Sequence, residues 1–299
     1  MFIRRLPRFE YHAPTSLDEA LKLLAQYGTK ARVFAGGTDL FGAMKRREIV
    51  PEHLINLKGI AGLKGIDHDE EEGLSIGGLT LLGDLERSQI IKDKLTILRD
   101  ALNVLASPQI RNLGTIGGNL CGAVPSADTL PPLIASGASV KLTGNKEERT
   151  VLVEQFFKGP RESVLRNDEI LTQIIIPNPP ENSGGAYIKL MTRNALELAI
   201  VGVGVHLRLD KDGKTCQKAK IALGAVAPTP IRAHLAEAVL NNQVINADQA
   251  GKAGKVASSE ASPISNVRAS KEYRMEMIGA LTKRAVMEAH RRIRAKSKR

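Results

Sequence analysis

The N-terminal part of the chain alternates between helical and extended hydrophobic patterns, which predicts a small unit of helices and strands. Over residues 15–28 apolar residues recur every three or four positions, as they do on one face of a helix. Ser16 and Glu19 form a capping box at the start of this helix, and Gly28 is a typical stop signal at its end. Two short buried strands and one further helix complete the unit, at 31–35, 54–58 and 40–47.

The central part has the same mixed character and ends at a clear break. Its pattern predicts a hairpin, two helices and two strands, at 63–77, 80–88, 94–106, 138–142 and 170–176. Thr80 is the expected cap of the first of these helices. Pro, Asn and Ser then gather over residues 177–183, which is typical of a linker. We therefore expect a first domain over 1–178, with subdomains at about 1–58 and 59–178, and a second domain over 183–299.

The second domain has a different order of elements. Three runs that alternate in the manner of strands come first, at 186–193, 201–209 and 216–226. Three helical patterns follow, at 231–240, 248–258 and 271–294. Strands followed by helices are typical of a layered domain, so the pattern predicts an α+β fold in which helices cover a three-stranded antiparallel sheet.

The charge of the chain is strongly positive but unevenly placed. Of the formal net charge of +11, residues 283–299 contribute eight Lys or Arg against the single Glu288. Aromatic residues are 3% of the chain and none lies in this tail, so no platform for base stacking is visible. We expect a solvated helix end or a docking segment rather than a nucleic-acid-binding protein.

The remaining bulk properties exclude several classes of protein. No apolar run approaches the length of a membrane span, and the N-terminal residues lack the apolar stretch of a secretory signal, so a cytoplasmic location is expected. The two cysteines, Cys121 and Cys216, form no metal-binding pair, and an iron–sulfur cluster would need about four thiolates. The scattered histidines show no metal-ligand spacing, so we expect neither a metal site nor a catalytic residue in this chain.

The first motif that could bind a ligand follows the predicted strand at 31–35. Two glycines there are followed by a hydroxyl, a carboxylate and a helix, so backbone N–H groups could approach an anion closely. We expect Asp39 to cap the helix, because a carboxylate would repel a phosphate. An ordinary tight turn remains the alternative. The residues of this motif are Val33, Phe34, Ala35, Gly36, Gly37, Thr38, Asp39 and Leu40.

A second glycine motif, GTIGGN at residues 114–119, has a similar composition, and we expect a strand to lead into it. A second set of backbone amides would suit a diphosphate held from two sides. Asp128 could accept hydrogen bonds from ribose hydroxyls, or could belong to the first turn of a helix. Neither motif is a P-loop or a dinucleotide-binding fingerprint, because both of those glycine patterns are absent.

Taken together, the two motifs resemble those of one family. AGGTDL at 35–40, SPQIRN at 107–112, TIGGN at 115–119 and PSAD at 125–128 are similar to segments of the FAD-binding subunits of the molybdenum hydroxylases. That family includes the medium subunit of aerobic carbon monoxide dehydrogenase and the flavin domain of xanthine dehydrogenase. The resemblance covers nearly the whole chain. It implies a two-subdomain FAD-binding domain of the PCMH type, followed by the three-stranded antiparallel sheet with helices.

The resemblance also implies which residues bind FAD. Val33 to Leu40 would hold the pyrophosphate through backbone amides, and Asp128 would lie near the ribose or pyrophosphate. Leu171 would pack against the flavin end, and Lys189 would lie near the isoalloxazine ring, where its charge would favour the reduced flavin. The second motif would hold the same cofactor through Thr115, Gly117, Gly118 and Asn119.

The partners follow from the same resemblance. A large subunit would hold a molybdenum pterin, and a small subunit would hold two [2Fe–2S] clusters. Electrons would pass from those clusters to the FAD of this chain and on to an external acceptor, within a complex expected to be a dimer of heterotrimers. Two alternatives stay open: a self-contained flavin oxidoreductase of the same fold, and a binding or assembly module without flavin. Intact glycines speak against the latter, because such positions are expected to need glycine only beside a close ligand.

Overall fold

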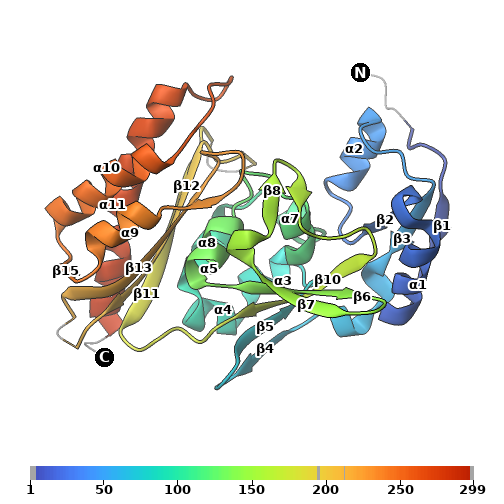
Figure 1. Cartoon of the computed structure of the whole chain (residues 1–299), viewed down its shortest axis with the longest axis horizontal. Coiled ribbons are helices and arrows are strands. Elements are labelled where there is room, and N and C mark those ends of the chain that lie inside the picture. Colours follow the sequence, from blue (N-terminus) through green and yellow to red (C-terminus); the bar gives the residue numbers. More distant parts are fainter. Residues whose placement is uncertain (1–4, 194–195, 212, 297–299) are drawn as a thin grey trace.

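The computed structural model describes residues 5–193, 196–211 and 213–296 of the chain. The chain forms three lobes in a row (Figure 1). An N-terminal lobe lies at one end, a mixed central lobe in the middle, and a sheet covered by helices at the other end. This arrangement confirms the α+β fold that the sequence predicted.

The N-terminal lobe is a three-stranded parallel sheet with two helices. The strands are β1 (Glu10–His12), β2 (Ala31–Phe34) and β3 (His53–Asn56), and they lie in the order β1-β3-β2. Helix α1 (Leu17–Tyr27) connects β1 to β2, and α2 (Leu40–Arg46) connects β2 to β3. Because β2 lies at an edge of this sheet, the loop that follows it is free to face the central lobe.

Helix α1 shows why the local pattern was informative. Ser16 accepts a hydrogen bond from the backbone N–H of Glu19, and the Glu19 carboxylate accepts one from the backbone N–H of Thr15. The apolar stripe of the helix is buried against the sheet, which stabilises the lobe by roughly 1.5–3 kcal/mol for each large side chain. Gly28 ends the helix with a positive φ of 52°, a conformation that glycine adopts without strain.

The central lobe is built on an antiparallel sheet with strand order β4-β5-β10-β6-β7. Its strands, together with a separate hairpin of β8 and β9, are β4 (Ile66–Asp69), β5 (Gly73–Gly77), β6 (Ser139–Gly144), β7 (Glu148–Leu152), β8 (Phe157–Gly159), β9 (Glu162–Ser163) and β10 (Glu169–Ile176). Its helices are α3 (Leu82–Arg87), α4 (Gln89–Lys94), α5 (Thr96–Val104), α6 (Pro108–Arg111), α7 (Ile116–Cys121) and α8 (Leu130–Ser136). Short 3-10 turns complete the lobes, at Gly28–Lys30, Leu57–Gly59, Ala61–Leu63 and Val153–Gln155.

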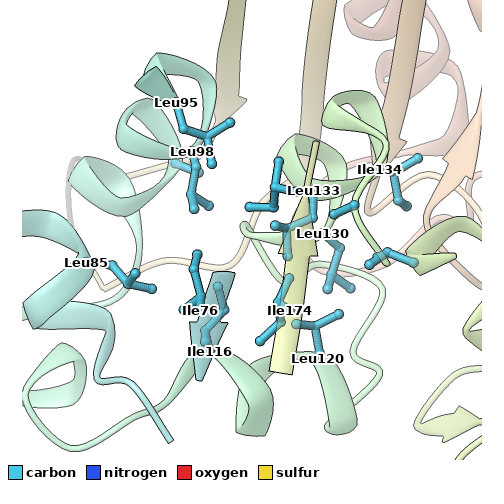
Figure 2. Close-up of a cluster of buried hydrophobic side chains, with 14 of the residues drawn as sticks. Ile76, Leu85, Leu95, Leu98, Ile116, Leu120, Leu130, Leu133, Ile134 and Ile174 are labelled. Carbon is cyan, nitrogen blue, oxygen red and sulfur yellow. The ribbon is translucent and has the colours of Figure 1, made fainter. Parts of the chain in front are cut away.

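The core of the central lobe anchors the short helix α7. Ile116 and Leu120 on α7 are fully buried, and they share one hydrophobic cluster with Ile76 of β5 and Ile174 of β10 (Figure 2). A helix of six residues has little stability of its own, so this packing holds it in place. The second glycine motif is therefore positioned by the core of the central lobe.

The C-terminal lobe contains the three long antiparallel strands that the sequence predicted, β11 (Ser183–Leu190), β12 (Val201–Leu209) and β13 (Thr215–Gly224). Three helices cover one face of this sheet, and α5 and α8 of the central lobe contact its strands (Figure 1). Two short strands add to its edge. The remaining elements are β14 (Ile231–Arg232), β15 (Gln243–Val244), α9 (His234–Leu240), α10 (Ala247–Glu260) and α11 (Lys271–Lys296).

Three local predictions were wrong, and in two of them a contact distant in sequence took precedence. The segment before the second glycine motif is the turn after α6 rather than a strand, because the backbone N–H groups of Leu113 and Gly114 both donate to the carbonyl oxygen of Ile110. Thr80 caps no helix, since its hydroxyl exchanges hydrogen bonds with the backbone of Gly65. The predicted helix at 231–240 starts as the short strand β14, paired with β13. The last residues of the basic tail, 297–299, lie outside the described residues.

Candidate functional site

The loop between β2 and α2 presents an open row of backbone amides. Gly37 has a φ of 73°, which turns the chain sharply away from the strand. Within the described residues, the backbone N–H groups from Gly36 to Leu40 donate to no protein acceptor. Unpaired backbone donors need a partner, which is water or an anion when the protein supplies none. The first glycine motif therefore has the character of an anion-binding loop.

The two glycine motifs are in direct contact. A Cβ atom on Gly36 would lie 2.2 Å from the carbonyl oxygen of Leu113 and 2.8 Å from the Cα of Gly114, so only glycine fits there. The hydroxyl oxygen of Thr38 lies 3.9 Å from the place where a Cβ on Gly114 would stand. The structure thus brings together two motifs that lie far apart in the sequence.

Asp39 lies at the N-cap position of α2 but does not act as predicted. Its side chain accepts no hydrogen bond from the helix. Instead its Oδ2 lies 4.0 Å from the position of a Cβ on Gly122, just after α7. The expected capping role is therefore wrong. The exposed carboxylate lies beside the second motif, where its charge opposes the binding of an anion.

The second motif differs from the first in that its amides are already paired. At the start of α7, the N–H of Ile116 donates to Thr80 (3.1 Å), and that of Gly117 donates to Gly78 (2.9 Å). The N–H of Gly118 donates to the side-chain oxygen of Thr115 at 3.0 Å. This motif does not supply the expected second row of open amides, because the protein uses them to hold α7. Gly118 is the exposed residue of this motif.

Leu171 lies directly behind the second motif. A Cβ on Gly117 would lie 2.5 Å from the carbonyl oxygen of Gly78, and a Cβ on Gly78 would lie 2.4 Å from that of Leu171. The backbone of α7 thus contacts the loop after β5, and this loop in turn contacts the backbone of β10. Sequence reasoning missed Gly78, although the pair of glycines at 77–78 repeats the signal of the two motifs.

The glycine contacts correct one inference from the sequence. Gly36 and Gly117 were expected to need glycine only if a ligand lay close to them. In the structure both are required by neighbouring backbone of the protein itself. These two glycines are therefore explained by the close packing of the protein backbone. The open amides of the first motif are more direct evidence of a ligand than the glycines are.

A cleft of about 670 Å³ opens beside the contact between the motifs. Its volume is in the range of pockets that hold cofactors, roughly 300–1,000 Å³. Ala35 borders it from the first motif and Thr115 from the second, and Lys58 and Lys64 also line it. A second cavity, of about 270 Å³, is lined by neither motif. Of these two cavities, the larger cleft is the one that both motifs border, although Asp84 also lines it and the residues from Gly36 to Leu40 do not.

Asp128 and Lys189 form a buried ion pair at the junction of the central and C-terminal lobes. The Lys189 ammonium donates to Asp128 Oδ2 at 2.8 Å, and the side chains of Lys189 and Asp128 are 0% and 7% exposed. The ammonium also donates to the backbone oxygens of Val104 (3.1 Å) and Glu197 (2.8 Å). All three donors of the lysine are therefore directed at protein acceptors.

Tyr187 is a member of this cluster that the sequence did not indicate. Its hydroxyl donates to Asp128 Oδ1 at 2.8 Å. Burial raises the pKa of the Tyr187 hydroxyl well above its usual value, and the adjacent Asp128 carboxylate adds to the effect. Burial also raises the pKa of Asp128, against the opposing charge of Lys189. The cluster is connected to the second motif along the chain. Thr129 directly follows Asp128, and its hydroxyl donates to the side-chain oxygen of Asn119 at 2.5 Å.

Within the part of the chain that the structure describes, no helix combines the length and the apolar character that a membrane crossing requires.

Known proteins match both the sequence and the fold. Residues 7–179 match the family model described as the FAD binding domain in molybdopterin dehydrogenase, and residues 186–289 match that of the CO dehydrogenase flavoprotein C-terminal domain. The carbon monoxide dehydrogenase medium chain of Hydrogenophaga pseudoflava is 36% identical, over 95% of this chain and 97% of that protein. The xanthine dehydrogenase FAD-binding subunit of Escherichia coli O157:H7 is 33% identical, over 93% and 95%.

Solved structures agree with these matches. A chain of the Hydrogenophaga pseudoflava carbon monoxide dehydrogenase superposes with a TM-score of 0.91 at 37% identity, covering 97% of this chain and 99% of its own. A chain of quinoline 2-oxidoreductase from Pseudomonas putida 86 gives a TM-score of 0.90 at 28% identity, with coverage of 97% and 99%.

Fold, cleft and matches together define a flavoprotein subunit of an oxidoreductase, with a FAD-binding domain. More particularly, the chain belongs to the family of FAD-binding subunits of the molybdopterin-containing dehydrogenases, to which the medium chains of carbon monoxide dehydrogenase also belong. The resemblance seen in the sequence is thereby confirmed.

Proposed function

We propose that this chain is the electron-transfer subunit of a molybdenum-containing hydroxylase, taking electrons from [2Fe–2S] clusters in a partner subunit to an external acceptor through bound FAD. The observation that carries the proposal is the row of open amides from Gly36 to Leu40, beside a cleft of about 670 Å³. Such a row binds a phosphate group through several N–H donors at once. FAD, when bound, supplies the redox centre, and the protein supplies its binding and orientation.

Most of the proposed FAD-binding residues lie in the two glycine motifs. The first motif offers open backbone amides and the exposed hydroxyl of Thr38 to the pyrophosphate. Lys58 and Lys64 in the cleft add positive charge that offsets Asp39. The full set is Val33, Phe34, Ala35, Gly36, Gly37, Thr38, Asp39, Leu40, Thr115, Gly117, Gly118, Asn119, Asp128, Leu171 and Lys189.

In this proposal Asp128 and Lys189 act mainly by position and charge. Because the Lys189 ammonium already has three protein acceptors, its effect on a flavin would be electrostatic rather than a direct hydrogen bond. The pair joins the C-terminal sheet to the central lobe and connects to Asn119 through Thr129. It would thereby fix the distance between the second motif and the C-terminal lobe.

The partners of the proposed complex are a large subunit with a molybdenum pterin and a small subunit with two [2Fe–2S] clusters, assembled as a dimer of heterotrimers in the cytoplasm. Support comes from the names of the relatives, which are the medium chain or the FAD subunit of multi-subunit dehydrogenases. One related structure is that of a carbon monoxide dehydrogenase that lacks the Mo-pyranopterin moiety of its molybdenum cofactor. The organic substrate would be bound by the large subunit.

The proposal is tested by purifying the protein with its native partners and recording an absorption spectrum, with chemical analysis for FAD, iron and molybdenum. We expect non-covalent FAD on this chain and co-purifying subunits that contain iron and molybdenum. The isolated chain is expected to show no turnover of the organic substrate. Turnover by the pure chain, or FAD without partner chains, would contradict the proposal in favour of a self-contained flavoenzyme.

The loop itself is tested by Gly37→Ala, because alanine is strained at a φ of 73° and would displace the open amides. The matched control is Gly213→Ala, which has a similar φ of 67° in the C-terminal lobe and no atom near the added Cβ. We expect Gly37→Ala to lose FAD and Gly213→Ala to retain it, with the same fold by circular dichroism. Equal FAD content in both variants would show that the loop does not hold the cofactor.

A further inference from the structure

Three side chains with metal-ligand chemistry meet on one face of the N-terminal sheet. Glu10 and His12 are two positions apart on β1, so both side chains lie on the same side of the strand. His53 on β3 is the register partner of Glu10. Their spacing in the sequence is uninformative, because His53 comes from a distant strand, and this is why the sequence predicted no metal site.

The distances between the three groups fit the coordination sphere of one ion. Nε2 of His12 lies 3.2 Å from Nδ1 of His53, which in turn lies 3.3 Å from Oε2 of Glu10. One ligand atom from each residue lies within 4.8 Å of the others. Tetrahedral bonds of about 2.0–2.1 Å to zinc place neighbouring ligand atoms roughly 3.3–3.4 Å apart. The two short separations are therefore close to those of a tetrahedral site.

The rings are held in place before any ion binds. Tyr27 stacks on His53 with ring centroids 3.6 Å apart and an interplanar angle of 16°, and it also packs against His12 with centroids 5.2 Å apart. The side chain of His53 is 12% exposed and that of Glu10 is 72% exposed. The site is thus held in place at His53, where Tyr27 stacks on the ring, and it is open to water at Glu10.

The chemistry of the cluster also favours an ion over hydrogen bonds alone. Nδ1 of His53 faces both the Nε2 of His12 and the Glu10 carboxylate. If this Nδ1 carries a proton, the proton serves only one of the two well; if it carries none, its lone pair faces the carboxylate without a hydrogen between them. A cation between the three atoms would interact with a lone pair from each. Two imidazoles with one carboxylate are a common ligand set for zinc and similar ions.

We propose that Glu10, His12 and His53 form a binding site for a divalent transition-metal ion of the zinc type, with the remaining coordination position taken by water. Such an ion would join the edge strand β1 to the central strand β3. The neighbouring strand β2 leads into the glycine loop at Gly36, so the ion would stiffen the sheet from which the open amides project. The site is separate from the cleft and does not depend on the proposed role of FAD.

The test uses the full chain, stripped of metal with a chelator and titrated with Co²⁺ followed by absorption, and with Zn²⁺ in competition with a coloured indicator. We expect one equivalent of Zn²⁺ with micromolar affinity, and cobalt bands typical of four- or five-coordination. His12→Asn and His53→Asn are each expected to weaken binding by at least about 10- to 100-fold, the effect already seen when only an outer-shell partner of a metal ligand is removed. Glu10→Gln should weaken it less.

The matched control is His234→Asn. His234 also lies beside a carboxylate, with Nε2 3.0 Å from Glu154, but the structure gathers no second histidine there within the described residues. This variant should bind the metal as the unaltered chain does. Circular dichroism of His12→Asn and His53→Asn establishes that they are folded.

Two results would overturn the proposal. The first is the absence of Zn²⁺ binding below millimolar concentration, and the second is binding that neither His12→Asn nor His53→Asn weakens. In both cases the histidines would serve only as a hydrogen-bonded contact that holds β1 on the sheet edge.

Discussion

The carbonyl oxygen of Leu113 lies only 2.2 Å from the position that a Cβ atom on Gly36 would occupy. The N-terminal lobe therefore touches the central lobe backbone to backbone, at the point where the first glycine loop meets the turn before α7. A contact of this kind leaves no room for a side chain, and it sets the position of the open amides relative to the cleft.

Replacing Gly36 should therefore separate the two motifs. We expect Gly36→Ala to lower the free energy of unfolding by about 1–3 kcal/mol, the usual cost of overpacking, and to release FAD. Thermal unfolding and bound flavin are the measurements. Gly62→Ala is the control, since no atom lies within 4 Å of the added Cβ and its φ is not positive. If Gly36→Ala behaves like Gly62→Ala, the lobes are not held by this contact.

Thr115 is predicted to stabilise the start of α7 through its hydroxyl. Its side-chain oxygen accepts from the N–H of Gly118 at 3.0 Å, and losing such a cap costs about 1 kcal/mol. Thr115→Val keeps the shape of the side chain but removes the acceptor, whereas Thr115→Ser keeps the acceptor. Urea unfolding should show the loss for valine and little change for serine. A similar loss for both variants would mean that the methyl group matters rather than the hydrogen bond.

Removing the carboxylate of Asp128 should leave a buried charge without its partner. Because the Lys189 side chain is 0% exposed, we expect Asp128→Asn to destabilise the protein by about 3 kcal/mol in urea unfolding. The double variant with Lys189→Met should lose less than the sum of the two single variants. Glu52→Gln is the control, since the Lys30–Glu52 pair is 62% exposed on both sides and such pairs contribute about 1 kcal/mol or less. Additive losses at Asp128 and Lys189 would disprove the coupling.

The stability of the C-terminal lobe should depend on pH through His206. Burial, with the nearby charges of Lys220 and Lys296, lowers the pKa of His206 from 6.5 to about 4. Between these values the unfolded chain binds the proton and the folded chain does not. Stability is therefore undiminished above pH 6.5 and is lost as the pH falls towards about 4, by up to about 3 kcal/mol at 1.36 kcal/mol per pKa unit.

Unfolding curves of the unaltered chain and of His206→Gln, measured between about pH 4 and 7, test this dependence. The difference between their free energies of unfolding should change across the range, because glutamine does not titrate. His234→Gln serves as the control, since the His234 side chain is 60% exposed. Parallel curves for His206→Gln and the unaltered chain would show that His206 does not contribute to the loss.

Much of the fold could be predicted from the sequence because its signals are local. The capping box at Ser16 and Glu19, the helical stripe behind it and the alternation of the C-terminal strands act over a few residues, and the structure contains each of these elements. The two glycine motifs identified the family together with the segments at 107–112 and 125–128, since each of these carries its pattern in one short stretch of chain. The domain limits at 178 and 183 stay a prediction.

The roles of individual side chains depended on contacts that no local pattern contains. Thr80 bonds to Gly65 rather than capping a helix, and Asp39 caps nothing although it stands at a helix start. The amides of α7 are closed because this helix packs on distant backbone at Gly78 and Thr80. His12 meets His53 because the strands β1 and β3 pair. Hydrophobic periodicity specifies an element and its buried face, but only the packed chain decides which polar groups are satisfied internally and which remain for a ligand.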